Sequence, residues 1–536
     1  MLIGDCCIRN ARQPHISKNI AVIFKDKQYN WKELNEACNS LAHALQEIGV
    51  KKGDRVALLL KNSDAVIISY YGITKIATIV PINYMSSKKE IIYILNDCEA
   101  EVLIISNNLL YHEEAIKTEC PKIKNIIVYN QDGLGTPPQY KNFEDLIIKY
   151  SKEEPIPFKE ILSTDMAYLM YTGGTTGLPK GVMLSHDSLL INSLSTATYV
   201  TKKIDPDNLK ILIAIPLFHI AANIGAMQAV LIGSTMVIMD GFVIKDFLET
   251  VVKHKCIGFG LVPTMINLLI NSSEIEEYRE YLEKNILMIV YGASPMAPTV
   301  LRKTIKTFPA SDFFQYFGQT EYSPVMAVLD PIDHEKALQP GNEYLLTAAG
   351  RAMVGTDIRI VNDEGVDVKL GEIGEIIAKG YGTMIGYWKN QDKTNETIKD
   401  NWLFTGDMGR MDEDGYIYCV DRKKDMIISG GENIYTKEVE DALYSHPAIL
   451  ECAVIGIPDE RWGEAVHAVV VLKKGFKKGE NITEDELIAH VKDQIARYKA
   501  PKSIQIKRSL PKSAQGKILK KDLRVKYWEG KERSIN

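Results

Sequence analysis

The sequence lacks any Cys-x-x-Cys pair and any cysteine–histidine pattern with metal-ligand spacing. Its eight cysteines are scattered over 536 residues, which is typical of reduced thiols and gives no indication of a disulfide framework or a zinc module. The first residues also lack the apolar run of a secretory signal, since Asp5, Arg9 and Arg12 stand there. The last residues carry no lipidation or retrieval signal. We therefore expect a cytoplasmic protein, and contact with a membrane surface stays open.

Charge is missing from one long segment, residues 211–239, which contains no Asp, Glu, Lys or Arg. Its length alone would allow it to cross a bilayer. Six residues interrupt or break the run: Pro216, His219, Asn223, Gly225, Gln228 and Gly233. Polar groups are costly inside lipid, so we expect a buried strand, a helix and a second buried strand, and no transmembrane segment.

The composition that is present is that of a globular protein, with 46% hydrophobic and 25% charged residues. A formal net charge of -5 argues against nucleic acid as the partner. Apolar runs at residues 55–60, 78–82 and 101–105 read as buried strands, with a helical pattern near 65–75. This alternation, over a chain too long for one core, predicts an α/β fold of layered sheets covered by helices in at least two domains.

The pattern changes beyond residue 410, where turn residues and a charged break precede a different run of elements. We expect a helix over 436–445 with Thr436 as its cap, a strand over 468–472 and a helix over 483–498. The stretch from Arg497 to Lys526 holds eleven basic residues and one acidic residue. It could be a solvated surface or a basic lid that faces phosphates. A compact α+β domain from about residue 425 fits normal domain sizes.

The strongest motif is the loop Tyr171-Thr-Gly-Gly-Thr-Thr-Gly-Leu-Pro-Lys-Gly181, which follows a predicted strand at residues 166–170. Its glycines let backbone N–H groups surround phosphate oxygens, while threonine hydroxyls and Lys180 add donors and charge. It is not a Walker A loop, because Lys180 lies three residues after Gly177 instead of next to it. A flexible turn is the alternative interpretation.

Four more motifs follow in order. Gln315-Tyr-Phe-Gly-Gln-Thr-Glu321 offers an aromatic face for a purine and a carboxylate for Mg²⁺. Phe404-Thr-Gly-Asp-Met-Gly409 places a carboxylate on a glycine-flanked turn, where it could accept protons from ribose hydroxyls. Asp421-Arg-Lys-Lys-Asp-Met-Ile-Ile-Ser-Gly-Gly431 is a charged linker, and Pro511-Lys-Ser-Ala-Gln-Gly-Lys517 lies in the basic stretch. Taken singly, each of these also has an ordinary structural explanation.

Together these motifs resemble those of the acyl-adenylate-forming enzymes, a family that includes acyl-CoA synthetases, beetle luciferases and the adenylation domains of peptide synthetases. The resemblance extends from Gly53-Asp-Arg-Val-Ala57 to Lys517 and keeps the family's motif order. It implies a large N-terminal adenylation domain at 1–420, a hinge at 421–424, and a small mobile C-terminal domain at 425–536. It implies an enzyme that makes an acyl-adenylate from ATP and a carboxylic acid, and then an acyl thioester.

The resemblance also implies a role for individual residues. Lys517, Glu321, Thr176 and His219 are the expected catalytic residues, with Glu321 and Thr176 at Mg²⁺, Lys424 as the swivel, and Gly430 and Gly431 beside the pantetheine of coenzyme A. Asp407 and Arg422 are expected at the ribose. The remaining expected ATP-binding residues are Thr172, Gly173, Gly174, Thr175, Gly177, Lys180, Ala293, Ser294, Gln315, Tyr316, Phe317, Gly318 and Thr320.

The acid is expected to be apolar. His219 stands where amino-acid-activating members carry an aspartate, and without that anion a buried site should reject ammonium. His219 is then either a guard of the acyl entrance or an ordinary core histidine. The expected acyl pocket comprises His219, Ala221, Val262, Ala293, Tyr316 and Val325. Tyr316 replaces a glycine of many family members, which argues for a narrowed tunnel.

The acceptor is expected to be coenzyme A, because no segment after Lys517 offers a pantetheine-bearing serine. A separate acyl carrier protein and a homodimer stay open. A P-loop NTPase or kinase is the rival from another class, and it would release ADP in place of AMP and pyrophosphate. A non-catalytic acyl-nucleotide binder is a further rival, against which the retained Lys180, Glu321, Asp407 and Lys517 argue.

Overall fold

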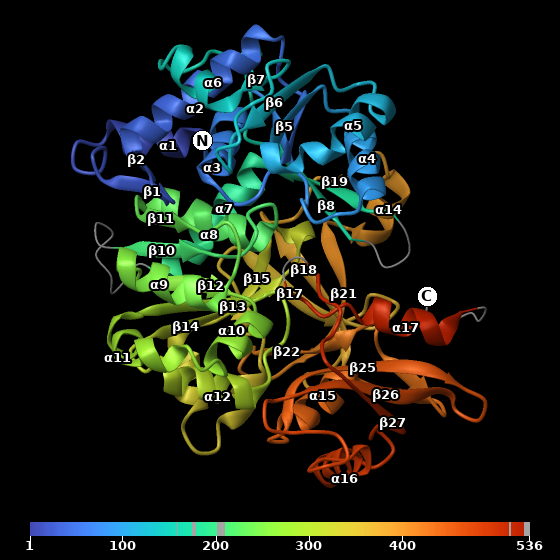
Figure 1. Ribbon diagram of the computed structural model, residues 1–536. Helices are drawn as coiled ribbons and strands as arrows, with labels where there is room; N and C mark the ends of the chain where they lie inside the picture. The colour runs from blue at the N-terminus through green and yellow to red at the C-terminus, as the bar shows by residue number, and fades with distance from the viewer. Residues whose placement is uncertain (158, 174–177, 201–208, 514–515, 530–536) are drawn as a thin grey trace.

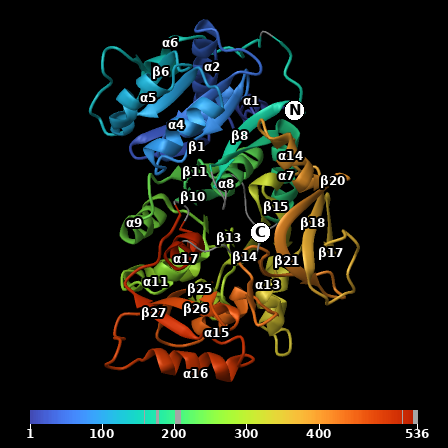
Figure 2. The same ribbon diagram turned by 90° about the vertical axis from the view of Figure 1, so that its right-hand side faces the viewer.

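The computed structural model describes residues 1–157, 159–173, 178–200, 209–513 and 516–529. Within these residues the chain forms four sheets with helices packed against them (Figure 1). Three sheets belong to the first 422 residues, and the fourth forms a separate lower lobe together with the C-terminal helices (Figures 1 and 2). The mixed α/β architecture expected from the sequence is confirmed.

The first sheet occupies the upper part of Figure 1 and has the order β19-β9-β8-β4-β3-β5-β6-β7. Its strands are β3 (Arg55–Leu59), β4 (Thr78–Pro81), β5 (Val102–Ser106), β6 (Asn125–Tyr129), β7 (Lys141–Asn142), β8 (Met166–Thr172), β9 (Lys180–Ser185) and β19 (Gly386–Tyr387). The associated helices are α2 (Trp31–Glu47), α3 (Asp64–Ile73), α4 (Lys88–Asp97), η1 (Asn107–His112), α5 (Glu113–Glu119) and α6 (Phe143–Lys149). β3, β4 and β5 pair in parallel and are almost wholly buried, as their apolar runs predict.

The second sheet has the order β16-β15-β14-β13-β12-β10-β11-β1-β2. Its strands are β1 (Ile20–Phe24), β2 (Lys27–Asn30), β10 (Lys210–Ile213), β11 (Thr235–Ile238), β12 (Gly258–Leu261), β13 (Met288–Gly292), β14 (Asp312–Gly318), β15 (Val325–Leu329) and β16 (Arg351–Ala352). On one face α7 (His186–Val200) and α8 (Ile220–Ile232) share a core with Met288, Phe314 and Tyr316. The other face packs against α9 (Ile244–His254), α10 (Pro263–Ile270), α11 (Ile275–Asn285) and α12 (Pro298–Thr307).

The uncharged segment 211–239 therefore forms β10, α8 and β11, as expected. α8 is buried between the sheets, which explains why it carries no charge. Gly233 ends it in the left-handed region at φ 79°, where glycine is favoured. Across the described part of the chain, every helix is too short or too polar to span a bilayer.

The third sheet comprises β17 (Thr356–Val361), β18 (Gly374–Gly380), β20 (Ile398–Lys399), β21 (Trp402–Met411) and β22 (Ile417–Arg422), with α14 (Gln391–Thr397) beside it. The fourth comprises β23 (Ile427–Ser429), β24 (Glu432–Ile434), β25 (Ile449–Asp459), β26 (Gly463–Leu472) and β27 (Ser503–Lys507). Sheet membership thus changes between Arg422 and Ile427. The remaining elements are α1 (Asp5–Arg12), η3 (Thr320–Tyr322), α13 (Pro331–Ala337), η4 (Glu343–Thr347), α15 (Thr436–Tyr444), α16 (Glu484–Gln494) and α17 (Lys520–Trp528).

Two details of the C-terminal elements differ from expectation. α16 begins after its cap Thr483 but ends at Gln494, because Ile495 turns to extended geometry and packs on the domain core. Thr436 is the first residue of α15 and makes no side-chain cap, since Tyr435 holds the N-cap position. The carboxylate that meets the start of α15 comes instead from Asp421, at the end of β22.

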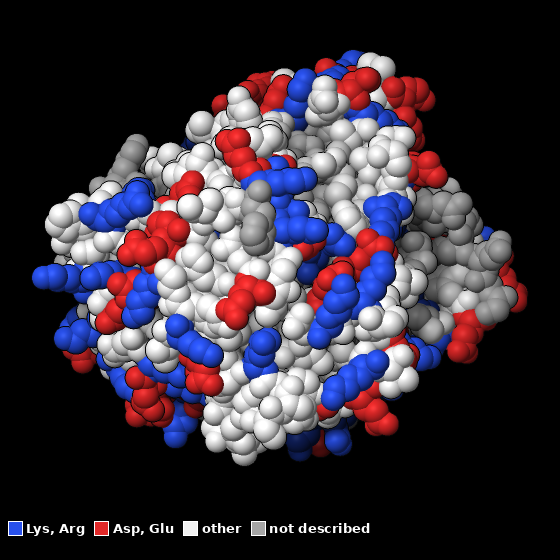
Figure 3. Space-filling view, turned by 90° about the horizontal axis from the view of Figure 1, so that it is seen from above, with Lys and Arg blue, Asp and Glu red and all other residues white. Residues whose placement is uncertain are grey.

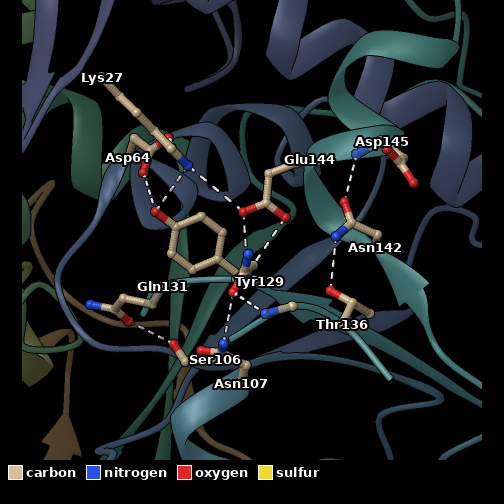
Figure 4. A network of polar contacts seen from close by, with 12 residues as sticks. Lys27, Asp64, Ser106, Asn107, Tyr129, Gln131, Thr136, Asn142, Glu144 and Asp145 are labelled. Atoms are coloured by element: carbon tan, nitrogen blue, oxygen red, sulfur yellow. Dashed lines mark hydrogen bonds and ion pairs between the residues drawn. The ribbon is translucent and has the colours of Figure 1, made fainter. Parts of the chain in front are cut away.

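A polar network lies at the carboxyl ends of β3, β5 and β6 (Figure 4). Asp64 is buried at the start of α3, and the hydroxyls of Tyr29 and Tyr129 donate to it at 2.9 and 2.5 Å. Lys27 Nζ lies 3.7 Å from the carboxylates of both Asp64 and Glu144. The buried charge of Asp64 is therefore satisfied within the fold, which is typical of a structural group.

Asn62 joins this edge to the second sheet. Its carbonyl accepts from Gln131 Nε2 at 3.4 Å, while its side chain accepts from the Leu217 N–H at 2.7 Å and donates to the Ile215 carbonyl at 2.9 Å. Asn62 is 3% exposed. These bonds fix the loop between β10 and α8, which carries His219.

Surface charge is mixed on the face shown in Figure 3, where Lys and Arg side chains lie among Asp and Glu side chains. Exposed pairs such as Lys117–Glu113 and Lys284–Glu280 follow the i, i+4 spacing of helices. Such pairs add little stability individually, but they compensate charge locally.

Candidate active site

The carboxyl ends of β13 and β14 form the centre of the candidate site. The two strands run parallel and end at Gly292 and Gly318. Ala293 and Ser294 follow the first strand, with Ala293 in the left-handed region at φ 65°. Gln315, Phe317, Gly318, Thr320 and Glu321 are all half-buried, in contrast to the buried neighbours on the strands. Ligands bind at this edge in open α/β sheets.

The predicted phosphate loop connects β8 to β9, whose ends Thr172 and Lys180 are paired. Gly174, Thr175, Thr176 and Gly177 lie outside the described residues. Tyr387 on β19 contacts both a carboxylate, Glu321, and a cation, Lys180. Its hydroxyl donates to Glu321 Oε1 at 2.9 Å, and Lys180 Nζ lies 5.7 Å from its ring centroid. The cation and the carboxylate thus face one part of the site.

Asp407 and Arg422 are cross-strand partners on β21 and β22. Arg422 Nε lies 3.0 Å from Asp407 Oδ1, with the Asp407 side chain 6% exposed and the Arg422 side chain 41% exposed. The Asp407 carboxylate raises the pKa of Arg422. Since one guanidinium nitrogen engages one carboxylate oxygen, the pair retains further donors and acceptors for a ligand.

Lys517 reaches this pair from the C-terminal domain. Its loop is anchored by Thr264 at the start of α10, whose hydroxyl donates to the Gly516 carbonyl at 2.7 Å. Burial, together with the positive charge of Arg422, lowers the pKa of Lys517 to about 8, while the charge of Asp407 opposes both effects. Lys517 in turn contributes to the pKa of His219, which burial lowers to about 4. The four residues therefore share one electrostatic environment.

The other lysines of the basic stretch are engaged elsewhere. Lys512 pairs with the buried Glu451, and Lys520 Nζ lies 2.8 Å from Glu440 Oε1. Lys521 is exposed at the start of α17. The sequence did not distinguish these lysines by composition, whereas in the structure the charges of Asp407 and Arg422 act on Lys517.

His219 occupies the N-cap of α8 and accepts the Ala221 N–H on Nδ1 at 3.2 Å. An accepting Nδ1 carries no proton, so the ring proton of the neutral form is on Nε2. With its pKa lowered to about 4, the imidazole is neutral at pH 7 and offers Nε2–H as a donor. This state fits a hydrogen-bond donor to a substrate carboxylate better than a cationic acid.

The residues expected to line the acyl pocket fall into two groups. Ala221 is half-buried on α8, and the hydroxyl of Tyr316 accepts a hydrogen bond from Gln228 Nε2 of the same helix at 3.2 Å. Val325 lies next to them in the core of this face, where Asn192 bonds its N–H and carbonyl. Val262 lies on the other face of the sheet, beneath Gly516 of the Lys517 loop, and Ala293 packs on that face too.

The linker residues form contacts of a different kind. Lys424 has its pKa lowered to about 8 by burial and by Arg422. Arg524 of α17 bonds the Asp425 carboxylate at 2.7 Å and the Lys424 carbonyl at 3.3 Å. Gly430 and Gly431 form the β23–β24 turn with φ 63° and 86°, and the Gly430 N–H donates to the Trp462 carbonyl at 2.8 Å.

Several site residues were not found from the sequence. Tyr387 lies on the short strand β19, outside any motif, and Thr264 matters only because the C-terminal loop docks against it. Asn62 acts through contacts with residues more than 150 positions away. Gln228 could have been suspected, because an amide inside an otherwise apolar helix needs a buried partner.

Comparison with known proteins agrees with this arrangement. Family models match residues 9–388 as "AMP-binding enzyme" and residues 438–517 as "AMP-binding enzyme C-terminal domain". A long-chain-fatty-acid–CoA ligase of Bacillus subtilis (strain 168) is 34% identical over 94% of this chain and 91% of its own. The fatty acid–[acyl-carrier-protein] ligase ScoC of Streptomyces coeruleorubidus is 32% identical over 96% and 95%.

Two solved structures extend the comparison to the fold. The anthranilate CoA ligase AuaEII in complex with anthranoyl-AMP superposes with a TM-score of 0.88 at 26% identity, covering 98% of this chain and 97% of its own. ATP-bound MatB from Rhodopseudomonas palustris superposes with a TM-score of 0.86 at 26% identity, covering 98% and 99%. The matched domains, the motif order and the shared architecture lead to one conclusion: this chain is a member of the AMP-binding enzyme family.

Proposed function

We propose that this chain is an AMP-forming acid–thiol ligase that activates an apolar carboxylic acid with ATP and transfers the acyl group to coenzyme A. The acid and ATP give acyl-AMP and pyrophosphate, and acyl-AMP and the thiol give the thioester and AMP. The observation that carries the proposal is the meeting of Lys517 with the Asp407–Arg422 pair and His219. Charged groups at this edge match a reaction in which charge accumulates on an α-phosphate and a carboxylate.

In the first half-reaction the acid oxygen attacks the α-phosphorus and pyrophosphate leaves. Lys517 would neutralise the charge shared by the carboxylate and the α-phosphate, and His219 Nε2–H would orient the carboxylate. Asp407 would accept from the ribose hydroxyls while Arg422 holds its carboxylate in place. Lys180, Thr172 and Gly173 would hold the leaving phosphates, and Phe317 would face the adenine.

Glu321 would hold Mg²⁺, which would supply positive charge to neutralise the phosphates of ATP. No cluster of three or more His, Cys, Asp or Glu suited to a metal occurs in the described ranges. A single carboxylate fits Mg²⁺ that takes most of its ligands from phosphates and water. The Tyr387 hydroxyl occupies one Glu321 oxygen, and among the described residues no hydrogen bond to the other is found. Thr176 is proposed as the second protein contact. The related MenE of Bacillus subtilis is described in complex with ATP and magnesium ion.

The second half-reaction is proposed to require rotation of the domain 425–536 about Lys424. This proposal is supported by the charges of Asp407 and Arg422 acting on Lys517 in the present arrangement, while the Gly430 N–H bonds Trp462 of its own domain. Rotation would withdraw Lys517 and bring the Gly430–Gly431 turn to the acyl-adenylate. Both residues have positive φ, where glycine is favoured, and their lack of a side chain would let a pantetheine approach the backbone closely.

The proposal that coenzyme A is the acceptor is supported by the names of related proteins. Relatives from Bacillus subtilis and Salmonella typhimurium are named long-chain-fatty-acid–CoA ligases. A second candidate acceptor is an acyl carrier protein, which is favoured by the similarity to the carrier-protein ligase ScoC. The two differ only in what presents the pantetheine thiol.

The test is acid-dependent exchange of labelled pyrophosphate into ATP, followed by thioester formation with coenzyme A or with a phosphopantetheinylated carrier protein. Exchange with apolar acids supports adenylation, and thioester with coenzyme A alone supports the ligase assignment. Thioester formed only with the carrier protein selects the second candidate. ADP release without exchange would refute the proposal.

A further inference from the structure

One face of α8 borders open space, although the helix is otherwise buried. Ala221 and Gly225 are half-buried, and a Cβ added at Gly225 would meet no atom within 4 Å. Ala221, Gly225 and Gln228 follow i, i+4, i+7 spacing and therefore share this face. The open strip begins one residue from the helix N-terminus, next to His219.

The facing wall is the second sheet. Gly260 pairs with Val290, and Gly292 pairs with Tyr316, so these residues lie on one side of their strands. Val290 and Tyr316 pack with the core that includes α8. A Cβ at Gly260 would find its nearest neighbours only at 3.8–4.0 Å. The wall opposite α8 is thus lined by Gly260 and the half-buried Val290, whereas the Cβ position of Gly292 is already filled by the backbone of Tyr316.

Two contacts fill the far part of this space. Gln228 Nε2 donates to the Tyr316 hydroxyl at 3.2 Å, and the two residues are only 7% and 9% exposed. Beside them Met288 covers Gly258, where a Cβ would lie 2.9 Å from the Met288 Cε atom. Tyr316 and Gln228 come from opposite walls, so their bond spans the gap between sheet and helix.

We infer that the Tyr316–Gln228 bond forms the end of the acyl pocket and limits the enzyme to short and medium-length apolar acids. The inference rests on the proposed function and specifies its substrate class. Seven residues separate Ala221 from Gln228, which is about 10 Å along a helix. That length matches an extended octanoyl chain and is well short of an extended palmitoyl chain.

The bond is a fixed wall and not a gate that opens at little cost. Moving Tyr316 aside would leave the amide of Gln228 buried without its partner, and an unpaired buried polar group is unfavourable. Long acids should therefore be poor substrates. Their kcat/KM should be low, and the difference should not be only a slower rate of binding.

The first test compares kcat/KM for pyrophosphate release with butyrate, octanoate and palmitate. We expect octanoate to exceed palmitate by at least about tenfold in the wild type. In Tyr316→Gly this ratio should fall by about tenfold or more, because the wall is removed. Tyr316→Phe isolates the hydrogen bond: it keeps the ring but leaves Gln228 without its partner, so the ratio should fall, but by less than in Tyr316→Gly.

Gly225→Leu provides an independent variant that keeps the core and favours the helix. Its side chain would enter the open strip, so octanoate should be lost by at least about tenfold relative to butyrate. Thermal unfolding and ATP binding report whether each variant is folded. Palmitate used as well as octanoate by the wild type, or unchanged ratios in folded Tyr316→Gly and Gly225→Leu, overturns the inference while adenylation stands. Absence of pyrophosphate release with every acid refutes the proposed function instead.

Discussion

The two ends of the candidate site differ in the residues that line them: one end is ionised and the other is largely apolar. The nucleotide end brings together ionised groups from distant segments, namely Asp407, Arg422 and Lys517. The proposed acyl end is a strip of small residues on α8 and on the facing sheet, ended by Tyr316 and Gln228. Ionised groups suit chemistry that is the same for every acid, while an apolar pocket can change length through one side chain. The comparison therefore separates the reaction from its specificity.

Lys517→Ala should give the largest effect, because it removes the cation that meets the accumulating negative charge. We expect acid-dependent pyrophosphate exchange to fall by about 10²–10³-fold. Lys521→Ala is the matched control, since Lys521 is exposed in the same basic stretch. Thioester formation from supplied acyl-AMP should change little in either variant. Exchange at wild-type rate in Lys517→Ala would show that the nucleotide end does not depend on this lysine.

Asp407→Asn should have the next largest effect. It should weaken the binding of ATP and leave the preference among acids unchanged. A hydrogen bond to a charged group contributes about 1.5–3 kcal/mol, so the KM for ATP should rise about 10- to 100-fold. The octanoate-to-palmitate preference should stay as in the wild type, because Asp407 lies at the other end of the site. A changed acid preference would contradict the division into two ends.

The same division explains what the sequence could and could not predict. Buried strands such as Arg55–Leu59 and the loop before Lys180 have strong local patterns, so they were found from the sequence. Lys517 was selected only by family resemblance, because its neighbours share its chemistry. Gln228 and Tyr387 act through contacts between segments far apart in the chain, which no local pattern encodes.

The kcat/KM of adenylation should fall by about tenfold per pH unit on the alkaline side. The pKa of Lys517 is lowered to about 8, so the protonated cation is present below pH 8 and is lost as the pH rises through that value. We expect kcat/KM for the acid to fall above about pH 8, since this parameter reports the free enzyme. Lys517→Arg, whose charge persists, should lose this alkaline limb even if it is slower. An unchanged limb would assign it to another group.

Asp421→Asn should have the smallest effect and should shift the balance between the half-reactions. The Asp421 carboxylate accepts from the Thr436 N–H and hydroxyl at 2.5 and 2.7 Å, so a residue of β22 caps α15 across the proposed hinge. Weakening that cap costs about 0.5–2 kcal/mol in the arrangement that places Lys517 in the site, and nothing once the domain has rotated. Pyrophosphate exchange should therefore slow severalfold more than thioester formation from acyl-AMP. Thr483→Ala is the matched control, because Thr483 caps α16 from within the same domain. It should lower stability without changing the ratio of the two rates, and an equal change of that ratio in both variants would exclude Asp421 as a contact specific to one domain arrangement.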